Sequence, residues 1–140
     1  MKPRVLMTVF ALTLTAAVRA ETPAGEDPFA RLLFPPEKVI GHALEIGLDD
    51  SQKNSIRIEV QKVQTKFLDV QFELQSEVEK MTRLLQEKTV DETKVLAEVD
   101  RILALEKEIK KTQITLLVRI KNLLTPAQQA KLSEIQKAGK

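Results

Sequence analysis

The fold is decided by residues 50–87, which read DSQKNSIRIEVQKVQTKFLDVQFELQSEVEKMTRLLQE and contain neither glycine nor proline. Apolar side chains recur in this stretch at alternating steps of four and three residues, the period of one face of an α-helix. The stretch therefore predicts one helix of about 38 residues, ~55 Å long. Its apolar seam is Ile56, Val60, Val63, Phe67, Val70 and Leu74, continued after a four-residue stutter by Val78, Met81 and Leu85.

Capping signals on the C-terminal side of this stretch predict a second long helix. Asp49 or Asp50 caps the first helix, residues 88–91 break its pattern, and Asp91 caps a helix that ends near Asn122. The second helix carries two apolar rows, which together are wider than a two-stranded seam needs. One row is Val95, Val99, Ile102, Ile109, Leu116, Ile120 and Leu123, and the other is Leu96, Leu103, Leu117 and Leu124.

Two short helices are expected at the ends of this pair. Pro35 and Pro36 open the first, and Gly47 occupies the position that follows a helix end. Thr125 caps the last helix and Pro126 takes its first position. The sequence thus predicts an all-α domain over residues 35–140, in which a long antiparallel helical hairpin is flanked by two short helices. Because one hairpin cannot cover such wide apolar stripes, we expect a homodimer.

The N-terminus has the pattern of a signal peptide. Lys2 and Arg4 precede a 14-residue apolar run, and small residues at positions 18 and 20 allow cleavage before Glu21. The alternative is a retained N-terminal anchor helix, although the run is too short to span a bilayer. Cleavage leaves a flexible leader over residues 21–34, a mature net charge of −1 and no stable membrane span. The expected location is the periplasm.

Composition excludes several classes of function. The chain has no cysteine, so disulfides and thiolate chemistry are absent, and its single histidine has no nucleophile at a suggestive spacing. There is no glycine-rich phosphate loop and no interleaving of aromatic with basic residues. We therefore expect no enzyme, no cofactor and no nucleic-acid partner.

Two helix starts share a pattern that resembles a known family. Leu48-Asp49-Asp50-Ser51-Gln52 and Leu124-Thr125-Pro126-Ala127-Gln128 each place a leucine, a capping residue and a glutamine at fixed spacing. The second matches the L-T-x-x-Q motif, and the first has aspartate in place of threonine. A pair of such motifs around a helical hairpin, behind a signal peptide, resembles the periplasmic Spy/CpxP family, which includes zinc-resistance-associated and heavy-metal-resistance sensor proteins. The resemblance spans about residues 35–136.

The resemblance implies a cradle-shaped homodimer. Spy-like members hold unfolded client proteins without ATP, CpxP-like members act on an envelope stress sensor, and other members sense heavy metals. Clients would meet apolar side chains that lie off the helix seam together with a basic stretch, unless the hairpin and the dimer bury those apolar groups. The candidate client-binding residues are Ile58, Leu68, Phe72, Lys107, Lys110 and Lys111. His42 and Glu45, one turn apart, are the candidate metal ligands of the alternative function.

Overall fold

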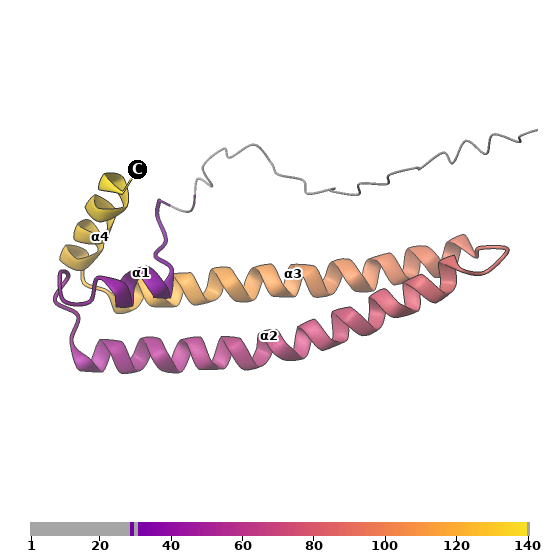
Figure 1. The fold of residues 1–140 in the computed structure, drawn as a ribbon, viewed down its shortest axis with the longest axis horizontal. Coiled ribbons are helices and arrows are strands. Elements are labelled where there is room, and N and C mark those ends of the chain that lie inside the picture. The colour runs from indigo at the N-terminus through magenta and orange to yellow at the C-terminus, as the bar shows by residue number, and fades with distance from the viewer. Residues whose placement is uncertain (1–28, 30, 140) are drawn as a thin grey trace, which may run out of the picture.

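A computed structural model describes residue 29 and residues 31–139 of the chain. Four helices follow one another: α1 (Pro36–Gly41), α2 (Asp50–Leu85), α3 (Glu92–Leu123) and α4 (Pro126–Ala138). Figure 1 shows that α2 and α3 run side by side as a long hairpin, with α1 and α4 at its open end. The all-α class and the helical hairpin are therefore confirmed.

The expected signal peptide over residues 1–20 and most of the expected leader lie outside the described residues. Within the part of the chain that the structure does describe, no helix is both long enough and apolar enough to cross a membrane.

The predicted caps start all three of the longer helices. Asp49 accepts a hydrogen bond from the backbone N–H of Gln52, Asp91 from that of Lys94, and Thr125 from that of Gln128. These side-chain oxygens satisfy N–H groups that have no partner inside the helix.

The short helix α1 ends at Gly41, earlier than the sequence indicated. Residues 42–47 continue as turns, and Gly47 adopts a φ of +66°, in the left-handed region where glycine has no steric penalty. The N–H of Leu48 reaches the carbonyl of Ala43 at 2.8 Å, and the N–H of Gly47 reaches that of Leu44 at 3.3 Å. These two bonds form a Schellman motif, so Gly47 does end a helical turn as predicted.

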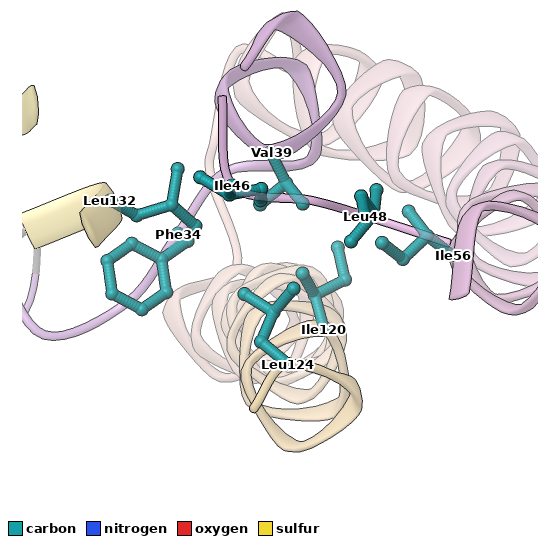
Figure 2. Packing of buried hydrophobic residues seen from close by; sticks show 8 residues of the cluster. All are labelled: Phe34, Val39, Ile46, Leu48, Ile56, Ile120, Leu124 and Leu132. Carbon is teal, nitrogen blue, oxygen red and sulfur yellow. The ribbon is translucent and has the colours of Figure 1, made fainter. Parts of the chain in front are cut away.

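The hydrophobic core lies at the open end of the hairpin. Its residues come from all four helices and from the segments that join them, and Figure 2 shows them converging. Phe34, placed by sequence at the end of a flexible leader, is only 2% exposed and packs in this core. The cluster is Phe34, Val39, Ile46, Leu48, Ile56, Ile120, Leu124 and Leu132.

The distal part of the hairpin differs from the predicted seam. Val78 and Leu85 are 47% and 55% exposed, so the expected stutter is wrong. The regular spacing instead continues from Leu74 through Glu77 to Met81 and Leu84, and these three side chains are half-buried. A helix that keeps its period places whatever residue stands at the next position in the seam, and here that residue is a glutamate.

Candidate functional site

The two motif glutamines meet at the open end of the hairpin. The Nε2 of Gln52 donates to the Oε1 of Gln128 at 2.8 Å, and the Nε2 of Gln128 donates to the Oε1 of Gln52 at 3.0 Å. The second N–H of Gln52 binds the carbonyl of Leu123 at 2.8 Å, and that of Gln128 binds the carbonyl of Gly47 at 3.1 Å. Gln52 thus ties the start of α2 to the end of α3, and Gln128 ties the start of α4 to the turn before α2.

Both glutamine oxygens also close a capping box. The Oε1 of Gln52 accepts from the N–H of Asp49 at 3.1 Å, and that of Gln128 accepts from the N–H of Thr125 at 2.9 Å. Each amide therefore donates two hydrogen bonds and accepts two, which is its full capacity. This arrangement leaves no group for an outside ligand, so the motif residues have a structural role.

The remaining motif residues support the same structure. Leu48 and Leu124 are 6% and 5% exposed and belong to the core. Pro126 occupies the first turn of α4, where its missing N–H has no intrahelical acceptor to lose.

A basic groove runs along the hairpin between α2 and α3. It has a volume of about 480 Å³ and is lined by two pairs of lysines at i,i+4 spacing, one on each helix. Of the three lysines named from the sequence as candidate client-binding residues, Lys107 and Lys111 line the groove and Lys110 does not. The basic lining residues are Lys62, Lys66, Lys107, Lys111 and Arg119, and the acidic one is Glu108.

Ion pairs neutralise only part of this groove. Lys66 binds Glu108 at 2.9 Å, and Glu59 binds both Lys62 and Arg119, at 2.9 and 2.7 Å. Hydrogen bonds from Lys62 and Arg119 hold the pKa of Glu59 below its ordinary value. Within the described residues, neither Lys107 nor Lys111 forms an ion pair. The groove therefore presents uncompensated positive charge to an anionic group.

Several large apolar side chains of the hairpin are exposed. Leu68 and Phe72, one turn apart on α2, are 53% and 65% exposed, and neither lines the basic groove. The Lys66–Glu108 and Glu59–Arg119 bridges set the antiparallel register, which brings Phe72 to the level of Leu103. Leu103 is 54% exposed and lies one turn from Lys107. Apolar and basic side chains thus share the middle of the hairpin.

Ile58, the third predicted apolar residue, lies apart from this region. It is 39% exposed and lines a shallow depression of about 340 Å³ near the open end, beside Glu59 and Arg119. Ten residues of helix separate it from Leu68, a distance of ~15 Å along the axis. The structure thus joins Leu68 to Phe72 but not to Ile58.

A separate groove between α1 and α2 is mostly apolar. It has a volume of about 620 Å³, and its lining includes Pro36, Ile40, Ile56 and Val60. Ile40 is 46% exposed there. A side chain that entered this groove would be desolvated by apolar contacts rather than by ion pairs.

The two candidate metal ligands are in contact with each other. The Nδ1 of His42 lies 2.9 Å from the Oε1 of Glu45, so these two atoms are hydrogen-bonded to each other. Among the residues that the structure describes, no cluster of three or more histidine, cysteine, aspartate or glutamate side chains is placed to hold a metal ion. A selective site for a transition metal normally needs three or four donors.

Lys62 and Lys66, two lysines of the groove, were not singled out from the sequence, where only the basic stretch of α3 drew attention. The signal was present, because the i,i+4 spacing of Lys62 and Lys66 repeats that of Lys107 and Lys111 and places each pair on one helix face. The register that brings the two helix faces together could not be predicted from the sequence.

No protein-family model, no curated protein and no solved structure matches this chain.

Proposed function

We propose that this protein is a periplasmic, ATP-independent chaperone that binds unfolded proteins along its helical hairpin. The observations that carry the proposal are the basic groove that holds Lys107 and Lys111 and the exposure of Leu68 and Phe72 at the same levels along the hairpin. The resemblance of the two helix starts to the Spy/CpxP family supports the same function.

Such a surface suits an unfolded chain because it offers two kinds of contact. Exposed lysines attract acidic segments over a Debye length of ~8 Å in physiological salt, and so raise the rate of encounter. Apolar side chains then bind the client by removing hydrocarbon from water, at about 25 cal/mol per Å². Neither step needs a nucleotide, a metal or a covalent intermediate.

We further propose that the working form is a cradle-shaped homodimer. The distal half of the hairpin carries four exposed apolar residues, here called the distal apolar row: Val78 and Leu85 on α2, and Leu96 and Leu103 on α3, each pair at seven-residue spacing. Large apolar patches are rare on monomeric proteins, and a second copy of the chain would cover this row.

The test compares lysines that differ in their place on the hairpin. The double variant Lys107→Gln/Lys111→Gln should suppress aggregation of an unfolding client less well, and should slow association at low salt by about threefold or more. Lys110→Gln is the control, because it removes one positive charge from the same helix outside the groove. Equal effects of the double variant and the control, after correction for total charge, would count against the groove as the client site.

A second arm separates the chaperone from a metal sensor. His42→Ala should leave client protection unchanged, with or without zinc, because the imidazole lies on the turn after α1 and lines neither the basic groove nor the Leu68–Phe72 region. A tight, stoichiometric zinc site that disappears in His42→Ala, combined with no client protection by the wild type, would favour the sensor function instead.

A further inference from the structure

Two glutamates face each other inside the distal part of the hairpin. Glu77 of α2 stands at the seam position described above, and Glu98 of α3 is the one charged residue among the buried residues of the described chain. Their side chains are 16% and 3% exposed. Buried carboxylates are uncommon because water stabilises their charge better than a protein interior does.

Each glutamate has one partnered oxygen and one unpartnered oxygen. Lys80 binds the Oε1 of Glu77, and the NH1 of Arg101 binds the Oε2 of Glu98 at 2.9 Å. The Oε2 of Glu77 and the Oε1 of Glu98 are buried and have no hydrogen-bond partner among the described residues. Two acceptor oxygens on facing carboxylates need a hydrogen between them, and neither supplies one when both are ionised.

The contact between the two glutamates shifts their pKa values in opposite directions. Contact with Glu98 and then with Lys80 lowers the pKa of Glu77, whereas contact with Glu77, followed by burial, raises the pKa of Glu98. A proton held by Glu98 can be donated to the carboxylate of Glu77, which gives both unpartnered oxygens a hydrogen bond.

We propose that Glu77 and Glu98 hold one proton between them and act as a pH-sensitive latch between the distal parts of α2 and α3. With one proton the latch is closed by a carboxyl–carboxylate hydrogen bond. Loss of that proton leaves two facing negative charges, and the latch loosens while the core at the open end is unaffected. This device does not depend on whether the hairpin binds clients.

The direction of the pH effect follows from the two pKa shifts. Glu98 stabilises the fold below its ordinary value of 4.5 and loses this contribution as pH rises through its raised pKa. Glu77 stabilises the fold above 4.5 and loses its contribution as pH falls through its lowered pKa. The latch is therefore tightest around 4.5 and loosens on either side. The other charged side chains that line the depression beside Glu98 are Lys80, Arg83, Glu87, Lys94 and Arg101. Glu73, Glu79, Glu92 and Asp100 are the exposed carboxylates nearby on α2 and α3.

Carboxyl ¹³C NMR on the wild-type chain tests the proton directly. We expect the Glu77 signal to titrate below 4.5 and the Glu98 signal above it, or both signals to show the same two steps if the pair titrates as a unit. A single titration step of both signals at the ordinary value of 4.5 would overturn the proposal.

Amide hydrogen exchange tests the mechanical consequence. After correction for intrinsic rates, amides of residues 74–84 and 94–104 should lose protection as pH rises from 4.5 through the raised pKa of Glu98, by up to about tenfold per unit of its shift. Glu98→Gln should abolish this loss, because an amide can donate to Glu77 at every pH and its oxygen can still accept from Arg101. Glu73→Gln should keep the wild-type profile.

Discussion

Gln128 is important for the stability of the fold although its side chain is polar. It is 8% exposed, and every hydrogen-bonding site of its amide is used. Gln128→Glu replaces the amide nitrogen with oxygen at nearly constant shape. The two contacts made by Nε2, to Gly47 and to Gln52, would then join two acceptors. We expect the free energy of unfolding to fall by about 1–3 kcal/mol, which chemical denaturation measures.

The matched control for this variant is Gln113→Glu. Gln113 is exposed on α3, so the same chemical change there should alter stability by less than about 0.5 kcal/mol. If both variants unfolded at the same denaturant concentration, the Gln52–Gln128 pair would not have the structural role assigned to it.

At the scale of the helices, ion pairs across the hairpin add to the packing of its seam. Glu59 of α2 binds Arg119 of α3, and its pKa is lowered by Lys62 and by Arg119. A lowered carboxyl pKa contributes stability above 4.5 that is lost as pH falls through the lowered value. Glu59→Gln should therefore lower the melting temperature at neutral pH by about 1–5 °C.

The same variant makes a second prediction as pH falls. Well below 4.5 the wild-type carboxyl is also neutral, so the two melting temperatures should converge. Glu106→Gln, at an exposed position of α3, is the charge control and should change the melting temperature little at either pH. A difference between wild type and Glu59→Gln that persisted in acid would mean that packing, rather than charge, is lost.

The helices were predictable because their signals are local. Asp49, Asp91 and Thr125 cap the helices that the sequence assigned to them, and the Gly47 turn ends as expected. Each signal depends on a side chain and backbone groups only a few residues away, so no tertiary information was needed.

The pairing of faces was less predictable because it depends on register. From the sequence, we assigned Val78 rather than Glu77 to the seam, because apolar residues usually face inward. In the structure Glu98 stands opposite Glu77, and Lys80 and Arg101 offset their charge, so the seam keeps its period. Phe34 was assigned to the leader for a related reason, since its neighbours are prolines and its partner Leu132 is distant in the chain.

At the scale of the whole molecule, we expect two copies to associate through the distal apolar row. The purified mature protein should have about twice the mass of one chain by light scattering at micromolar concentration. Leu96→Lys/Leu103→Lys should weaken the dimer by about tenfold or more, because it places two charges where leucines would be buried. Both positions are 54% exposed in the single chain, so helicity should survive.

Val118→Lys is the control for this pair. It adds a lysine to α3 at a position that is 41% exposed and lies near the open end, away from the distal row. A wild-type protein that is monomeric at all concentrations, or a dimer that Val118→Lys disrupts as strongly, would contradict the proposed interface.

The position of the core at the open end of the hairpin also bears on the order of folding. Residues beside the tip are close in sequence, so the entropic cost of closing that loop is small, yet little apolar surface is buried there. The stabilising contacts join segments far apart, such as Gln52 with Gln128, 76 positions away, and Leu32 with Lys121, 89 positions away. During synthesis from the N-terminus, the hairpin could therefore begin to form early, but its core would be complete only after Leu132 had been added. Completion of the core therefore requires α1 to α4 together, because its contacts join segments far apart in sequence.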